Sequence, residues 1–168
     1  DVGAMERAKY YAEMLGCDVG MFYKRRDYSK VVNGKNPVVC HQYMGSEING
    51  KNVIVVDDMI SSGGSMLEVC DELRKNGANK VYLVVTYCLF TEGYEIFEEA
   101  YKNKLFNKLY TTNLSYIEPQ VAKKKWIKVV DCSFDVAKVI NNLSKNKSIS
   151  HMLNNKDEII NMIREKNN

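Results

Sequence analysis

One stretch of the sequence decides the fold: Val53-Ile54-Val55-Val56-Asp57-Asp58-Met59-Ile60-Ser61-Ser62-Gly63-Gly64-Ser65-Met66. Its first four residues are β-branched and apolar, which predicts a strand buried on both faces, as in a parallel sheet. We expect this strand over Val53–Asp58, then a loop of small residues, then a helix over Met66–Lys75. A strand, an acidic pair, a small-residue loop and a helix indicate a ligand site at the carboxyl end of a parallel strand.

The loop from Ser61 to Ser65 suits a phosphate monoester. Gly63 and Gly64 let the chain turn tightly and direct successive backbone N–H groups inward. The following helix adds the partial positive charge of its N-terminus, and the hydroxyls of Ser61, Ser62 and Ser65 are further donors. The loop is not a P-loop, because no Lys-Ser or Lys-Thr follows its last glycine, and the pattern G-x-G-x-x-G is absent.

Asp57 and Asp58 require a different partner, because carboxylates repel a phosphate. A vicinal diol can donate two hydroxyls to them, and Mg²⁺ is the other option. A ribose 5-phosphate moiety offers a phosphate and a diol together, and therefore fits the loop and the acids. A tight strand-to-helix turn with incidental acids is the plain alternative.

The composition is that of one α/β domain with a sizeable core: 168 residues, 45% hydrophobic and 27% charged. A net charge of +3 is too small to favour nucleic acid or a membrane as partner. We see no signal peptide and no apolar run long enough for a bilayer, and expect a cytoplasmic protein. Because the chain begins with Asp1, we expect it to be a piece of something longer. The dispersed cysteines predict reduced core thiols: Cys17, Cys40, Cys70, Cys88 and Cys132.

Strand and helix patterns alternate along the chain and predict a mostly parallel, twisted sheet flanked by helices. The expected strands cover Val19–Tyr23, Val38–Met44, Val53–Asp58, Val81–Tyr87, Lys108–Thr112 and Ile127–Asp131. The expected helices cover Met5–Leu15, Met66–Lys75, Tyr94–Asn103, Phe134–Leu143 and Asp157–Arg164. We expect one α/β domain over residues 1–144 and a C-terminal helical tail over 145–168 that packs on the domain or on a neighbouring subunit.

Two further stretches are candidates for phosphate chemistry. Lys24-Arg25-Arg26 follows the first expected strand at the root of a polar, mobile loop, where three cations could clamp transferring phosphates. Without that context the same residues describe a solvated charge run. Asp1-Val2-Gly3-Ala4 precedes the first helix and could be a second phosphate or metal station, although Asp is also an ordinary N-cap.

The segment Asp57–Ser65 resembles the phosphoribosyl-pyrophosphate (PRPP) motif, which phosphoribosyltransferases share with ribose-phosphate pyrophosphokinase, the PRPP synthetase. Three more stretches are similar to the C-terminal half of the pyrophosphokinase, in the same order: Asp1–Ala4, Lys24–Arg26 and Ser148-Ile149-Ser150. The resemblance implies a type I phosphoribosyltransferase-like fold. It also implies that the family's N-terminal half, with a metal-binding histidine and most of the adenine pocket, is absent from this chain.

The resemblance implies transfer of the diphosphoryl group of MgATP to the 1-hydroxyl of ribose 5-phosphate, giving PRPP and AMP. Lys24 and Arg26 would then be catalytic, closing over the transferred phosphates. Other implied roles are ribose-5-phosphate binding by Asp57, Asp58, Ser61, Ser62, Gly63, Gly64 and Ser65, a pyrophosphate loop of Asp1, Val2, Gly3 and Ala4, and contact of Asp1 with Mg²⁺. The isolated domain is expected to be inactive, and the family implies a homo-oligomer, commonly a hexamer.

The chain departs from the family pattern at two positions. Ser61 stands where many members have Asp, which exchanges a carboxylate for a donor that a phosphate tolerates. Ala4 replaces the second glycine of the pyrophosphate loop and limits how closely the backbone can approach. Two other functions remain open: a phosphoribosyltransferase that consumes PRPP, and a non-catalytic partner that regulates a PRPP synthetase. Retention of Lys24 and Arg26 argues against the non-catalytic partner.

Overall fold

A computed structural model describes residues 2–26, 38–152 and 155–167, with the backbone alone for 2–4, 23–26, 38–42, 151 and 167. The helices and strands follow one another in the order α1 Val2–Leu15, β1 Met21–Arg26, β2 Val38–Met44, β3 Asn52–Ile60, α2 Gly64–Lys75, β4 Lys80–Cys88, α3 Glu95–Lys102, β5 Lys108–Thr112, α4 Pro119–Ala122, β6 Ile127–Val130, α5 Ser133–Ser144, a 3₁₀ turn Ser150–Met152 and α6 Lys156–Asn167. In these described ranges, no helix is both long and apolar enough to cross a membrane.

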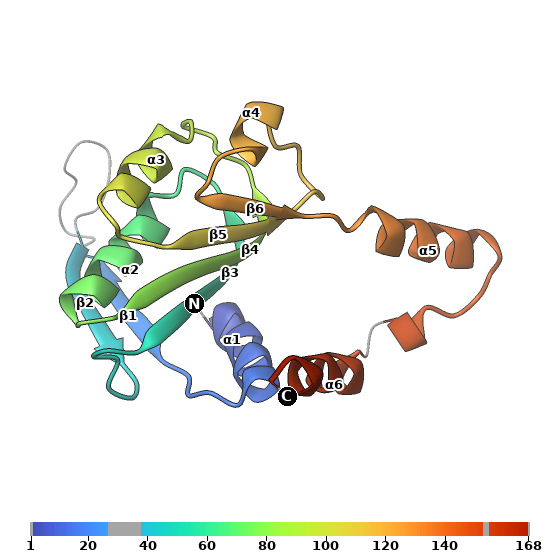
Figure 1. Cartoon of the computed structure of the whole chain (residues 1–168), viewed down its shortest axis with the longest axis horizontal. Helices are drawn as coiled ribbons and strands as arrows, with labels where there is room; N and C mark the ends of the chain where they lie inside the picture. Colours follow the sequence, from blue (N-terminus) through green and yellow to red (C-terminus); the bar gives the residue numbers. More distant parts are fainter. Residues whose placement is uncertain (1, 27–37, 153–154, 168) are drawn as a thin grey trace.

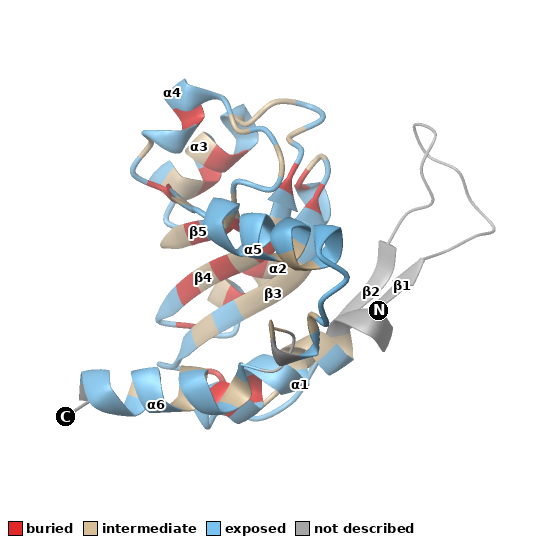
Figure 2. Ribbon diagram, turned by 90° about the vertical axis from the view of Figure 1, so that its right-hand side faces the viewer, coloured by how far each residue is buried: buried red, intermediate tan, exposed pale blue. Residues whose placement is uncertain are grey.

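The central sheet is parallel, as the sequence predicted, with the strand order β3-β4-β5-β6 (Figure 1). Val55 pairs with Leu83, and Leu83 with Leu109, so the strands share one direction and one register. Alternate residues of β4 are buried, and Figure 2 shows the burial concentrated along this strand. The predicted fold class, α/β with flanking helices, is confirmed.

The first two strands form a separate antiparallel hairpin. β1 begins at Met21 and continues through Arg26, so the expected strand Val19–Tyr23 was placed too early. Lys24, Arg25 and Arg26 therefore belong to the strand itself and do not follow it. Basic residues can continue a strand in a two-stranded hairpin, because one face of such a sheet can remain in water.

The core is densest where α3 meets the sheet, around three buried aromatic residues. The rings of Phe97 and Trp126 stack at 6.0 Å, and Phe106 contacts both edge-on at 6.3 and 6.4 Å. Cys70 and Cys88 are also buried, and burial raises the pKa of these thiols to about 12 and about 11. Both are core thiols as predicted, whereas Cys17 is exposed and was wrongly placed in the core.

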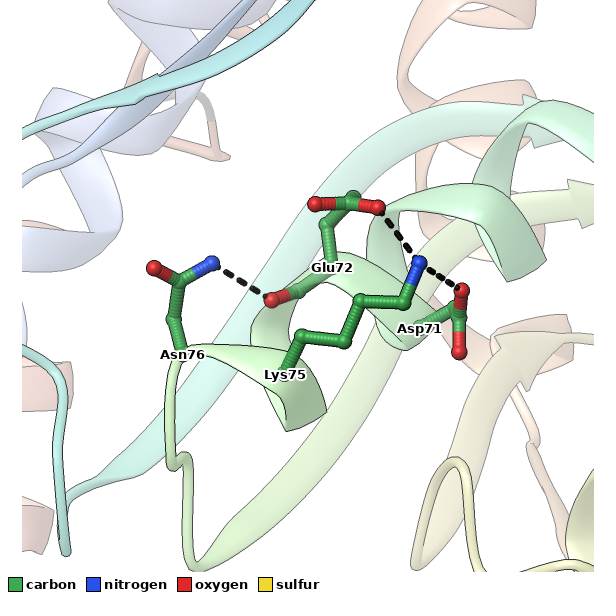
Figure 3. A network of polar contacts seen from close by, with 4 residues as sticks. All are labelled: Asp71, Glu72, Lys75 and Asn76. Atoms are coloured by element: carbon green, nitrogen blue, oxygen red, sulfur yellow. Dashed lines mark hydrogen bonds and ion pairs between the residues drawn. The ribbon is translucent and has the colours of Figure 1, made fainter.

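The C-terminal end of α2 lies at the opposite end of the sheet from the expected site and is closed by a polar network (Figure 3). The Lys75 ammonium lies 2.8 Å from an Asp71 oxygen and 2.9 Å from a Glu72 oxygen. The Asn76 amide donates to the Glu72 carbonyl at 2.7 Å. The Asn76 bond satisfies one carbonyl at the end of the helix, and the Lys75 cation lies where the negative end of the helix dipole favours it.

The last two helices lie outside the sheet. Figure 1 shows α5 projecting from the end of β6, and none of its residues, all of which are described, is buried. α6 returns to α1, where Lys156 forms an ion pair with Glu13 at 2.8 Å. The C-terminal tail thus packs on its own domain, which is one of the two arrangements that we expected.

Candidate functional site at the carboxyl end of β3

The acidic pair lies within the last part of β3. The strand continues to Ile60, whose side chain is buried and whose backbone pairs with Cys88. The expected end at Asp58 was therefore too early. Because β3 and β4 remain paired past Asp57 and Asp58, the sheet holds the backbone of both acids in place.

The small-residue loop is shorter than expected, because α2 begins at Gly64 and not at Met66. Gly63 occupies the N-cap position with φ 93°, a conformation that residues with a Cβ rarely adopt. A Cβ placed there would also overlap the ring of Phe97. Position 63 thus requires glycine for two reasons: the conformation of the turn and the close approach to the aromatic core.

The N-terminus of α2 presents unpaired amides at the loop. The first hydrogen bond of the helix runs from the Leu67 N–H to the Gly63 carbonyl at 3.1 Å. The amides of Gly64, Ser65 and Met66 precede it and have no acceptor within the helix. A Cβ at Gly64 would meet no atom within 4 Å, so the space beside these amides is open. Such a helix end can bind an anion.

The two carboxylates of the acidic pair have different environments. The Asp57 carboxylate accepts from the Asp58 N–H at 2.9 Å, and the Asp58 carboxylate accepts from the Met59 N–H at 2.8 Å. Burial raises the pKa of Asp57, whereas the bond from the Met59 amide is the main cause that lowers the pKa of Asp58. Asp58 is therefore the more readily ionised of the two and the more exposed.

Arg7 is a site residue that the sequence reasoning missed. It lies on α1 and places a guanidinium nitrogen 3.7 Å from an Asp58 carboxylate oxygen. Its charge lowers the pKa of both Asp57 and Asp58, although in each case it is a smaller cause than those above. The sequence offers little signal for it, because helical periodicity does not reveal which strand α1 packs against.

Thr91 is a second missed residue. Its N–H donates to the Ser61 carbonyl at 3.1 Å, and the hydroxyls of the two residues lie 3.3 Å apart. Thr91 follows β4, the strand next to β3. A signal was available, since the carboxyl ends of neighbouring parallel strands meet at one edge of the sheet.

The remaining predicted site residues are only partly described. Lys24 and Arg26 lie in β1 with a described backbone, but their side chains are outside the described residues, as is all of Asp1. Val2, Gly3 and Ala4 form the first turn of α1 and are helical, which corrects the expectation of a loop before the helix. The role of this segment towards a pyrophosphate stays a prediction.

A metal site is not preformed among the described residues, which contain no cluster of three or more acidic, histidine or cysteine side chains suited to a metal. The donor set nevertheless fits Mg²⁺ bound together with a substrate. Carboxylate oxygens are its usual protein ligands, and one or two of them suffice when phosphates supply the rest. Asp58 is exposed and has a lowered pKa, so it offers an ionised oxygen donor.

A strand end, a glycine turn and open helix amides beside two acids define the class of the protein. The chain belongs to the phosphoribosyl transferase domain family, whose model matches residues 1–134. Within this class it is similar to ribose-phosphate pyrophosphokinases. It is 39% identical over 131 residues to the one from Pyrococcus abyssi and 33% identical over 153 residues to the one from Mycoplasmopsis pulmonis.

These similarities cover most of this chain and less than half of each relative. The Pyrococcus alignment spans 78% of the chain and 40% of the relative, and the Mycoplasmopsis alignment spans 89% and 44%. A crystal structure of phosphoribosylpyrophosphate synthetase from Mycobacterium smegmatis superposes with a TM-score of 0.66 at 23% identity, covering 86% of this chain and 43% of that one. At this identity the superposition shows the shared fold.

Proposed function

We propose that this chain is the ribose-5-phosphate-binding, C-terminal half of a ribose-phosphate diphosphokinase. The reaction transfers the diphosphoryl group of MgATP to the 1-hydroxyl of ribose 5-phosphate and gives PRPP and AMP. The observation that carries the proposal is the open N-terminus of α2, next to the acidic pair at the end of β3. The similarity to ribose-phosphate pyrophosphokinases supports it.

In this proposal the two parts of the site bind the two ends of ribose 5-phosphate. The amides of Gly64, Ser65 and Met66, with the loop hydroxyls, bind the 5-phosphate. Asp57 and Asp58 accept hydrogen bonds from the sugar hydroxyls. The helix amides and the acidic pair both lie on backbone that the helix and the sheet hold in place. Binding ribose 5-phosphate at both ends orients its 1-hydroxyl, which favours an in-line transfer.

The remaining candidate residues would act on the diphosphoryl group that is transferred. Lys24 and Arg26 would stabilise the charge that spreads over the phosphate oxygens in the transition state. Mg²⁺, bound with the nucleotide, would neutralise part of the same charge, with Asp1 as its carboxylate ligand from this chain. Assembly into a homo-oligomer, with the isolated domain inactive, is part of the proposal.

One assay of the full-length protein tests the proposal. Incubation with MgATP and ribose 5-phosphate should produce AMP and PRPP in equal amounts. Release of pyrophosphate from PRPP only when a nucleobase is added would instead identify a phosphoribosyltransferase. If the protein has neither activity but alters the rate of an active PRPP synthetase, the non-catalytic partner is the correct function.

A further inference from the structure

The segment that follows β4 lies directly against the loop Ser61–Ser65, called the phosphate loop below. Beyond the paired strands, the Leu89 N–H donates to the Ile60 carbonyl at 2.8 Å and the Thr91 N–H donates to the Ser61 carbonyl at 3.1 Å. The Thr91 and Ser61 hydroxyls then meet at 3.3 Å. Backbone and side chain of Thr91 thus both contact the first residue of the loop.

An unusual backbone conformation places Thr91 there. Phe90 has φ 47°, a left-handed conformation that is rare for a residue with a Cβ and has an energetic cost. The Gly93 N–H closes the turn onto the Phe90 carbonyl at 2.9 Å. The Phe90 ring packs edge-on against Phe97 at 5.3 Å and Trp126 at 6.1 Å, which stabilises this conformation.

The same aromatic cluster supports both sides of the loop. Phe97 lies under Gly63, so closely that no side chain fits there, and it also contacts Phe90, which precedes Thr91. Gly63 and Thr91 are therefore both placed beside rings of the same aromatic cluster. This arrangement fixes the distance between the Thr91 hydroxyl and the loop.

When a phosphate is bound, the hydrogen bond between the Ser61 and Thr91 hydroxyls can have only one donor. A serine hydroxyl has one proton to donate and can accept as well. If Ser61 donates to the anion, Thr91 must be the donor in the bond between them. We propose that Thr91 is a positioning residue that directs the Ser61 proton to the 5-phosphate of ribose 5-phosphate, a role that rests on the function proposed above.

Calorimetric titration of the protein with ribose 5-phosphate tests this role through a double-mutant cycle. Thr91→Val removes the hydroxyl and keeps the backbone bond, and should weaken binding by about threefold to tenfold, the value of one neutral hydrogen bond. Thr91→Ser keeps the hydroxyl and should restore wild-type affinity. The double variant Ser61→Ala with Thr91→Val should bind no more weakly than Ser61→Ala alone, because Thr91 acts through Ser61.

Ser115→Ala is the matched control, because the Ser115 hydroxyl donates its one proton to the Cys88 carbonyl, at 3.2 Å and at the same strand end. It should bind like the wild type. Wild-type affinity in Thr91→Val, or additive losses in the double variant, would overturn the role of Thr91 alone. Failure of the wild type to bind ribose 5-phosphate would reject the proposed function itself.

Discussion

The two sides of β3 are built differently. Towards β4 and α3, the site rests on buried rings, with Phe97 fully buried and Trp126 3% exposed. Towards α1, the strand borders a cavity of about 710 Å³, whose lining includes Met5, Ala8 and Tyr11 of α1 and residues 52–56 of β3. Ile54 on this side is 43% exposed. The face of β3 towards the rings is closely packed, whereas the amino-terminal half of the strand borders open space on the α1 side.

This difference separates the two tasks assigned to the site. A loop that binds the 5-phosphate, as proposed, needs a fixed geometry, and the close approach of Gly63 to Phe97 restricts it. α1, which borders the cavity, also contributes Arg7 to the acidic pair. Substitutions on the packed side should therefore change stability and loop geometry together, whereas those on the open side should change the chemistry with little cost in stability.

The largest effect is expected from removing the ring on which the loop rests. Phe97→Ala should lower the free energy of unfolding by about 3–5 kcal/mol, because the site is completely buried and cannot collapse without moving Trp126 and Phe106. Tyr11→Ala, which removes a 36% exposed ring from the cavity side, should cost less than about 1 kcal/mol. Urea unfolding of both variants measures the contrast, and equal costs would show that the two sides do not differ.

The next effect concerns turnover and not stability. In the full-length protein, Lys24→Ala and Arg26→Ala should each lower kcat by about 100-fold or more, with little change in ribose-5-phosphate affinity, because the lost charge acts on the transferred group. Lys80→Ala, an exposed cation at the amino end of the sheet, is the control and should leave kcat unchanged. Normal turnover in the Lys24 or the Arg26 variant removes that residue from the mechanism.

Two neighbouring glycines sharpen the comparison further. Gly63→Ala should cost about 2 kcal/mol or more in stability, because its Cβ meets the Phe97 ring at a left-handed φ. Gly64→Ala meets no protein atom, so its stability should stay unchanged or rise by up to about 1 kcal/mol. Its affinity for ribose 5-phosphate should nevertheless fall by about tenfold or more, because the added methyl group occupies the space through which the phosphate would approach the helix amides. Full binding by Gly64→Ala would place the phosphate elsewhere.

The sequence predicted the parallel sheet and the glycine turn that leads into α2, because both depend on local patterns. The apolar run Val53–Val56 and the adjacent glycines are visible without tertiary structure. It did not predict Arg7 or Thr91, since their positions depend on how α1 packs and on the turn at Phe90. It also ended β3 too early, because pairing with β4 outweighs the low strand preference of two adjacent acids.

The acidic pair should matter for binding to a moderate degree. Asp57→Asn combined with Asp58→Asn keeps the size of both side chains and removes their charge. We expect ribose-5-phosphate affinity to fall by about tenfold, since bonds from hydroxyls to carboxylates are stronger than those to amides. Asp135→Asn in the first turn of α5 is the control. Calorimetry that finds equal affinity for the wild type and the double variant would remove the diol assignment.

The smallest expected effect is on stability, where Asp57 and Asp58 should contribute with opposite signs and in a pH-dependent way. The pKa of Asp57 is raised in the folded state by burial, so above its ordinary value of 3.8 the ionised group opposes folding. The pKa of Asp58 is lowered by the Met59 amide, so its ionised form stabilises the fold above 3.8, and this contribution is lost as the pH falls through its folded value. At pH 7, Asp57→Asn should therefore raise stability and Asp58→Asn should lower it, each by less than about 1 kcal/mol because solvent screens both groups. Urea unfolding at pH 7 and at pH 3 measures these differences, which should shrink at the lower pH, and changes of the same sign in both variants would contradict the assignment.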